Sequence, residues 1–287
     1  MLRHETASDL HELRDPIERS RVVRVRVEGP RGYAQGSPLP HVLVLPGFKG
    51  FMHWGFFPEL SHRIAQAGMV AVSLNTSGCG VGPDLETFTE LEAFERDTPS
   101  RQLEDLDRVR EYVLGRLPAV DREHLGLFGH SRGGAIVLLH AGRHRDYSAI
   151  ATWAAVDALD RYDDETRALW RTQGHLPVVH TRTGQILRMG VAALEDLEEN
   201  ADDLDVLLAC GGLRAPTLLV QGEADEAVDP ASVHRIAAAM PAGVGHVLTV
   251  EGAGHTFGAD HPLTHAGPEL DHVLTETVDH LRTNLAG

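Results

Sequence analysis

The sequence contains little cysteine and almost no lysine. Its two cysteines, Cys79 and Cys210, are too few and too far apart in 287 residues for a disulfide framework or a zinc site. Lys49 is the only lysine, and the other cationic side chains are arginines. The N-terminal stretch MLRHETASDLHELRD is charged throughout and lacks the apolar segment of a secretory signal. We therefore expect a cytoplasmic protein with reduced thiols.

Long apolar runs and positive net charge are also missing. No run of about 18 uncharged apolar residues occurs, which excludes a membrane-spanning helix. The formal net charge is −16, and nucleic acids and anionic membranes repel a chain this negative. We expect neither of them as a partner. The hydrophobic content of 42% is ordinary for a globular protein, and the length allows a large core.

The sequence has no clear motif for a metal or a nucleotide cofactor. His261 and His265 have the i, i+4 spacing of a metal pair, but proline and glycine surround them without a helical pattern. A solvated loop is the better interpretation of this segment. The glycines from Gly78 to Gly82 have neither the GxGxxG spacing nor the P-loop lysine. We predict a protein without metal or cofactor.

Short apolar runs alternate with helical patterns from about Leu39 to the C-terminus. Before them, residues 21–27 alternate charged and apolar side chains, as a half-exposed edge strand does. The apolar runs, typical of strands covered on both faces, are 41–45, 69–74, 124–128, 149–156, 217–222 and 246–250. The helical patterns are 57–67, 101–116, 133–143, 231–240 and 270–285. This order predicts a doubly wound, mostly parallel α/β sheet.

The alternation is interrupted between Asp157 and Gly212. This segment is charged and mixed, with helical hints at 163–172 and 192–205 and no clear strand. It contains Trp170 and several leucines, so it has apolar side chains to pack. We predict a single domain over residues 1–287, in which residues 157–210 form a small helical lid at the carboxyl edge of the sheet.

The segment GHSRGG directly follows the apolar run that ends at Phe128. The pattern Gly-x-Ser-x-Gly between a buried strand and a helix is a nucleophile elbow. Gly129 and Gly133 allow the strand and helix backbones to approach, which exposes Ser131 at the carboxyl edge of the sheet. A bare GxSxG also occurs by chance in tight strand-to-helix turns. The hypothesis that Ser131 is a nucleophile therefore depends on whether partners follow it.

A serine hydroxyl needs a base, and the base needs a carboxylate to orient it. In chain order the acid and then the histidine should each follow a strand. Asp225 lies in the loop after the run 217–222, and His255 lies in a glycine-rich turn after the run 246–250. Asp225 is favoured because it comes three residues after Gly222. The rival acids are Glu223, Glu226, Asp229 and Asp157.

The oxyanion formed when Ser131 attacks a carbonyl needs two hydrogen-bond donors, normally backbone N–H groups. One is expected from Arg132, directly after the nucleophile. The other is expected from Phe48, in the loop PGFKGF after the run 41–45, where glycines let the backbone approach.

Five motifs in this order resemble those of the α/β-hydrolase superfamily, most closely its dienelactone-hydrolase-like and S9-like esterase branch. They are LPGFKGFMHWGFFPEL, NTSGCG, GHSRGG, LVQGEADEAVDP and EGAGHTF. The resemblance covers roughly residue 21 to the C-terminus apart from the insertion. It implies a Ser-His-Asp hydrolase with Ser131, His255 and Asp225. Ser131 stands where dienelactone hydrolase itself has cysteine, and Pro46 stands where many relatives have histidine.

These observations predict a serine-dependent carboxylic ester hydrolase acting on a small-molecule ester. A modest pocket under a short lid favours small to medium or aromatic acyl groups, with Phe51, Trp54, Phe56 and Phe57 as further contributors to acyl preference. For Phe56 and Phe57 core packing is the better interpretation. Two alternatives are a peptidase or amidase of the S9-like type and a catalytically silent binding member of the fold.

Overall fold

The computed structural model, which describes residues 4–180 and 183–286, contains an eight-stranded sheet in the order β1-β2-β4-β3-β5-β6-β9-β10. The strands from β4 to β10 in this order are mutually parallel, whereas β2 pairs antiparallel with β4 and β1 antiparallel with β2. The strands are β1 (Thr6–Arg14), β2 (Val22–Pro30), β3 (Leu39–Leu45), β4 (Val70–Asn75), β5 (Val120–His130), β6 (Ala149–Trp153), β9 (Thr217–Gly222) and β10 (Gly245–Val250). The predicted mostly parallel sheet is confirmed.

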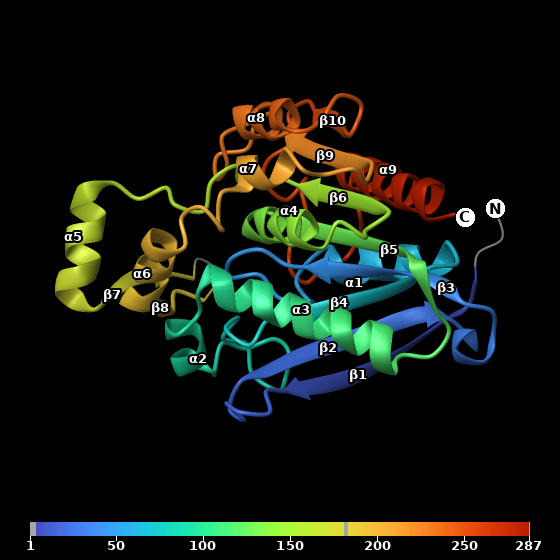
Figure 1. The fold of residues 1–287 in the computed structure, drawn as a ribbon, viewed down its shortest axis with the longest axis horizontal. Coiled ribbons are helices and arrows are strands. Elements are labelled where there is room, and N and C mark those ends of the chain that lie inside the picture. The colour runs from blue at the N-terminus through green and yellow to red at the C-terminus, as the bar shows by residue number, and fades with distance from the viewer. Residues whose placement is uncertain (1–3, 181–182, 287) are drawn as a thin grey trace.

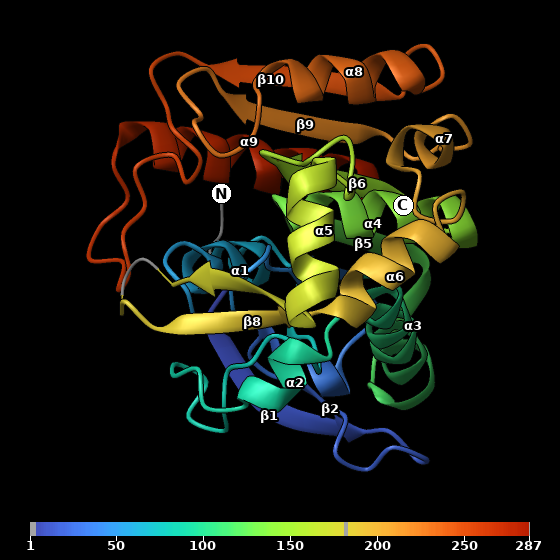
Figure 2. The ribbon, with the colours of Figure 1, turned by 90° about the vertical axis from the view of Figure 1, so that its left-hand side faces the viewer.

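Helices cover both faces of this sheet (Figures 1 and 2). One face packs against α1 (Phe57–Gln66) and α9 (Pro268–Leu285). The other packs against α3 (Pro99–Arg116), α4 (Arg132–His144), α7 (Val206–Cys210) and α8 (Ala231–Ala239). The start of α3 is set by Thr98, whose side chain accepts the Arg101 N–H, and by Pro99 in the first turn. In residues 4–180 and 183–286, no helix has the length and apolar character to cross a bilayer.

The prediction that residues 21–27 form an edge strand is wrong. They belong to β2, which pairs with β1 on one side and β4 on the other and is almost wholly buried. The charges that made it look exposed are neutralised locally: Arg24 bonds to Glu90 at 2.6 Å and Arg21 to Asp105 at 2.7 Å. The edge strand on this side of the sheet is β1, whose charged, irregular sequence carries no strand signal.

The segment between β6 and α7 leaves the sheet at the carboxyl ends of the parallel strands, where Figure 1 shows it on the left and Figure 2 in front. It contains α5 (Asp164–Gln173), β7 (His175–Val179), β8 (Ile186–Gly190) and α6 (Val191–Glu199). The sequence predicts no clear strand here, but β7 and β8 form an antiparallel hairpin. The two strands are short, and Pro177 interrupts the apolar pattern of β7, so no strand periodicity is visible in the sequence.

This segment has its own small apolar cluster. Trp170 of α5 is fully buried and donates its indole N–H to the carbonyl of Met189 at 2.8 Å. The cluster continues into Phe51, in the loop after β3, and into Phe88 and Phe94, which lie in the connection between β4 and α3. The segment therefore packs on the loops that follow these two strands of the sheet.

Candidate active site

Ser131 lies in a strained turn between β5 and α4. Its φ of 56° is in the left-handed region, which non-glycine residues rarely adopt. The two glycines of the motif are required by close backbone contacts: a Cβ on Gly129 would lie 2.3 Å from the carbonyl oxygen of Gly133, and one on Gly133 would lie 2.4 Å from that of Pro46. The strand, the helix and the loop after β3 therefore meet at Ser131, as a nucleophile elbow requires.

Asp225 lies after β9 with its side chain fully buried. Its Oδ1 accepts the N–H groups of Ala227 at 2.8 Å and Val228 at 3.0 Å, and its Oδ2 accepts the Gln221 amide at 3.0 Å. The same Oδ2 lies 2.8 Å from Nδ1 of His255. Burial alone would raise the pKa of this carboxyl, but the bonds to His255 and the backbone outweigh it and lower the pKa. Asp225 is thus a carboxylate at neutral pH.

The rival acids do not bond to His255 in the described structure. Asp157 accepts from Ser232 at 2.9 Å and pairs with Arg235, and Asp229 pairs with the same guanidinium at 3.0 Å. Glu223 and Glu226 are exposed on the surface of the loop. The geometry therefore brings together Asp225 and His255, the pair that the sequence favoured.

His130, directly before Ser131, is a residue whose contribution sequence analysis missed. Its imidazole is buried and its Nε2 lies 3.0 Å from the carbonyl oxygen of His255, with the two rings 4.6 Å apart. Burial and the neighbouring His255 lower its pKa to about 3, so the ring is neutral and donates Nε2–H to that carbonyl. His130 thus fixes the turn that carries His255. In the sequence, only the position of His130 next to Ser131 in GHSRGG indicates that it lies near the site.

The two predicted oxyanion donors lie on either side of the elbow. A Cβ on Gly47 would lie 2.7 Å from the carbonyl oxygen of His130 and 3.0 Å from Cβ of Ser131, so the loop that carries Phe48 touches the elbow. The guanidinium of Arg132 lies over the Phe48 ring, 4.1 Å from its centroid. The side chains of the two residues that carry the predicted donors are therefore in contact with each other.

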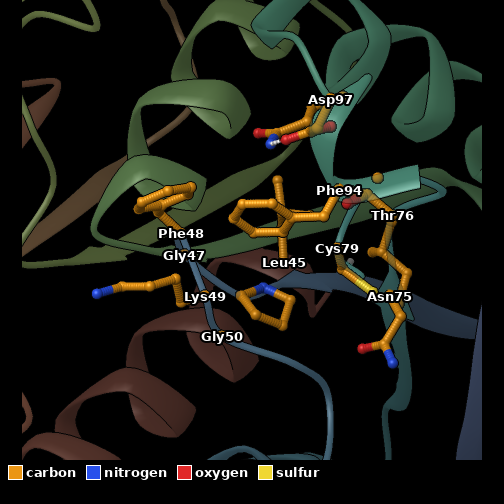
Figure 3. A pocket seen from close by; sticks show the side chains of 14 residues that line it. Leu45, Gly47, Phe48, Lys49, Gly50, Asn75, Thr76, Cys79, Phe94 and Asp97 are labelled. Carbon is orange, nitrogen blue, oxygen red and sulfur yellow. Dashed lines mark hydrogen bonds between the residues drawn. The ribbon is translucent and has the colours of Figure 1, made fainter. Parts of the chain in front are cut away.

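A buried carboxyl lies behind this loop. Asp97, after α2 (Leu91–Glu95), accepts the Gln102 amide at 2.5 Å and lines a cavity of about 20 Å³ with Phe48 and Phe94 (Figure 3). Burial raises its pKa to about 7, although the charge of Arg132 acts in the opposite direction. A Cβ on Gly78 would lie 2.2 Å from Oδ1 of Asp97, which explains the first glycine of the NTSGCG motif.

A second cavity, of about 490 Å³, opens directly on Ser131 and His255. Trp54 and Phe57 line it, whereas Phe51 and Phe56 do not and lie buried in the core. Of the four aromatic residues expected to shape acyl preference, two therefore face the cavity. The interpretation of Phe56 and Phe57 as core residues agrees with their burial, at 0% and 1% exposure, although Phe57 also borders the cavity.

Two further histidines line this cavity and were not singled out for it. His180 follows β7, and its ring lies 4.7 Å from Phe88. His261 stacks on Trp54, accepts the Gly55 N–H through Nδ1 at 3.0 Å, and contacts Glu86 through Nε2 at 2.9 Å. The segment with His261 and His265 is a loop, as predicted, and His265 is exposed, but His261 is not solvated, because its side chain is 7% exposed. Its contact residues are distant in sequence, so no local pattern predicts the burial.

Sequence comparison identifies one family. The model of the prolyl oligopeptidase family matches residues 54–271. No curated protein sequence matches the chain.

Solved structures with the same fold include esterases and a peptidase. A ferulic acid complex of Est1E from Butyrivibrio proteoclasticus has 18% identity and a TM-score of 0.69, covering 93% of this chain and 97% of that one. The esterase domain of a Rhodothermus marinus protein has 17% identity and a TM-score of 0.65, covering 98% and 100%. A puromycin-hydrolyzing peptidase of Mycobacterium tuberculosis has 19% identity and a TM-score of 0.66, covering 98% and 40%. The predicted α/β-hydrolase fold and the resemblance to the S9-like branch are confirmed.

Proposed function

This chain belongs to the prolyl oligopeptidase family of hydrolases, and we propose that it cleaves carboxylic esters with Ser131 as nucleophile, His255 as general base and Asp225 as the orienting acid. The observation that carries this proposal is a single cavity open to both Ser131 and His255, where the histidine is bonded to a buried carboxylate. A binding protein that had lost its chemistry would not need this bond, the strained elbow and the cavity together.

The proposed reaction proceeds through an acyl-enzyme. Ser131 Oγ attacks the ester carbonyl while its proton passes to Nε2 of His255, and Asp225 stabilises the imidazolium through Nδ1–H. The N–H groups of Phe48 and Arg132 stabilise the oxyanion. The proton then passes to the departing alcohol as the C–O bond breaks. Water, activated by the same histidine, hydrolyses the acyl-serine and restores the free enzyme.

We propose small to medium or aromatic acyl groups as substrates. The cavity of about 490 Å³ is within the usual range for small-molecule sites, and Trp54 and Phe57 provide apolar walls. A neighbouring structure, Est1E, was solved with ferulic acid, an aromatic acid, which supports testing the same class here.

Residues 157–210 are proposed as the lid that controls access to this cavity. Lys49 of the oxyanion loop donates to the carbonyl of Val179, at the end of β7, at 3.1 Å, and His180 lines the cavity. The α5–α6 part of the segment is therefore linked to the site. Its last helix, α7, packs on α4 and α8 instead, so the access function belongs to residues before it.

Amide hydrolysis is the second candidate. The family is named for peptidases, and the Mycobacterium tuberculosis neighbour hydrolyses puromycin, which favours testing amides beside esters. The two reactions share the proposed nucleophile and differ in the leaving group that His255 must protonate.

A substrate panel tests the proposal. Purified protein is assayed with p-nitrophenyl esters of increasing acyl length, feruloyl esters and amino-acyl amides. We expect the highest kcat/KM for short or aromatic acyl esters and a loss of several orders of magnitude in Ser131→Ala. Long-chain esters as best substrates would refute the small pocket, and amino-acyl amides as best substrates would favour the peptidase. Retention of turnover by Ser131→Ala would refute the nucleophile.

A further inference from the structure

Three side chains that can bind a metal meet between α3 and α4, away from the candidate active site. His140 and His144 are one turn apart on α4 and so lie on the same face of the helix. Asp107 of α3 faces them: its Oδ1 lies 3.0 Å from Nε2 of His140 and 2.5 Å from Nε2 of His144. All three ligand atoms lie within 4.8 Å of one another.

We propose that Asp107 Oδ1, His140 Nε2 and His144 Nε2 form a binding site for Zn²⁺. Two imidazoles and one carboxylate are a known zinc ligand set, with a fourth position left to solvent. Zinc–ligand distances of about 2.0–2.2 Å place tetrahedral ligand atoms about 3.3 Å apart. The two distances to Asp107, 3.0 and 2.5 Å, are shorter than this, so the side chains of Asp107 and His144 must rotate apart to admit the ion.

The surroundings of His140 suit a metal ligand. Its imidazole is fully buried, and its Nδ1 lies 3.1 Å from the hydroxyl of the buried Tyr147. When Nε2 binds the ion, Nδ1 carries the proton and donates it to Tyr147, which holds the ring in the ligating orientation. An ordinary surface ion pair does not need this second, buried partner.

The site is open to solvent on one side and carries little opposing charge. The side chains of His144 and Asp107 are 29% and 37% exposed, so an ion can enter past them. The neighbouring cation, Arg110, is paired with the carboxylate of Asp146. The strongly negative chain also attracts divalent cations.

The proposed ion has a structural role and does not take part in ester cleavage. His144 lies 13 residues after Ser131, at the opposite end of α4, which corresponds to about 20 Å along the helix. The ion would join α4, which follows the elbow, to α3. The sequence shows no motif for this site, because the two histidines lie 33 and 37 residues from the third ligand, Asp107.

Zinc titration of the metal-free protein tests this site. We expect calorimetry of the wild type to show a single Zn²⁺ site with a Kd in the micromolar range or below. The affinity of this site should fall at least about 100-fold in His144→Ala and in Asp107→Ala. Cobalt(II) should give the intense visible absorption of a four-coordinate ion in the wild type and lose it in both variants. The matched control is His124→Ala, which breaks an ordinary pair with Asp121 and should leave both signals unchanged.

A further variant and a stability measurement distinguish loss of Zn²⁺ binding from loss of folding. Tyr147→Phe keeps all three ligands and should weaken Zn²⁺ binding about 10- to 100-fold, because only the orienting bond to His140 is lost. Added Zn²⁺ should raise the melting temperature of the wild type but not of His144→Ala. Far-UV circular dichroism checks that each metal-free variant is folded. The proposal is overturned if the wild type has no micromolar site, or if folded His144→Ala binds Zn²⁺ as tightly as the wild type.

Discussion

Nδ1 of His255 lies 2.8 Å from Oδ2 of Asp225, although the two residues are 30 positions apart and belong to loops after different strands. The parallel pairing of β9 with β10 places both loops at the same edge of the sheet. A cavity joins the histidine to Ser131 at that edge. The order of strands thus brings three separate loops to one point.

Asp225→Asn should lower kcat about 10⁴-fold, because an amide at this position cannot hold His255 in the required tautomer. The matched controls are Asp229→Asn and Asp157→Asn, whose carboxylates pair with Arg235 instead. Steady-state kinetics on one activated ester compares the three variants. A larger loss of kcat in either control than in Asp225→Asn would identify that control residue as the orienting acid instead of Asp225.

His130→Leu should lower kcat about tenfold and change KM little, because the carbonyl of His255 loses its donor and the turn loosens. His130→Gln, which restores an N–H donor, should recover part of this loss. Since the His130 pKa is about 3, neither variant should shift the pH–activity profile above pH 4. A raised KM with unchanged kcat, or a shifted pH profile, would show that His130 acts on the substrate or on the proton transfer.

Gly47→Ala should lower kcat about 10²-fold, because the added Cβ meets the His130 carbonyl at 2.7 Å and moves the Phe48 N–H away from the oxyanion. The control is Gly115→Ala in α3, where no atom lies within 4 Å of the added Cβ. It should keep full activity and stabilise the fold by about 0.5–1 kcal/mol. Steady-state kinetics and thermal unfolding compare the two variants. Full activity in Gly47→Ala would count against the Phe48 N–H as an oxyanion donor.

Asp97→Asn should change how stability depends on pH. The folded-state pKa of Asp97 is about 7, above the unfolded value of 3.8, so the folded state binds the proton more tightly. The free energy of unfolding of the wild type therefore falls as pH rises between these values, and the penalty is complete above pH 7. The amide of the variant does not titrate in this range. Urea unfolding at pH 5 and pH 8 should show that the free energy of unfolding falls less between these two pH values in the variant than in the wild type. An equal fall in both proteins would contradict the raised pKa of Asp97.

The limits of helices and strands can be predicted from the sequence where hydrophobic periodicity and capping or turn residues determine them locally. Helices α1, α3, α4, α8 and α9 begin and end within about two residues of their predicted limits, because each has a clear apolar face or a capping residue. The run 149–156 is an exception: β6 ends at Trp153, where Ala154 adopts a positive φ of 47°. No local signal in the sequence marks that turn.

Features that depend on long-range pairing could not be predicted. β1 is largely exposed and charged, and only its register with β2 makes it a strand. His261 is buried through Trp54 and Glu86, both far from it in sequence. Ser131, His255 and Asp225 could be proposed from the sequence because chemistry restricts their order and their position after strands, whereas the contacts of His130 and His180 are visible only in three dimensions.

Covalent labelling tests the central claim most directly. Trypsin cleaves after Arg122 and Arg132, which releases Ser131 in the peptide EHLGLFGHSR, where it is the only residue with a hydroxyl group. After reaction with a fluorophosphonate, mass spectrometry should find one equivalent of label on this peptide and none in protein carrying Ser131→Ala. Label on a different peptide, or an unlabelled and fully active protein, would contradict the assignment of Ser131 as the nucleophile.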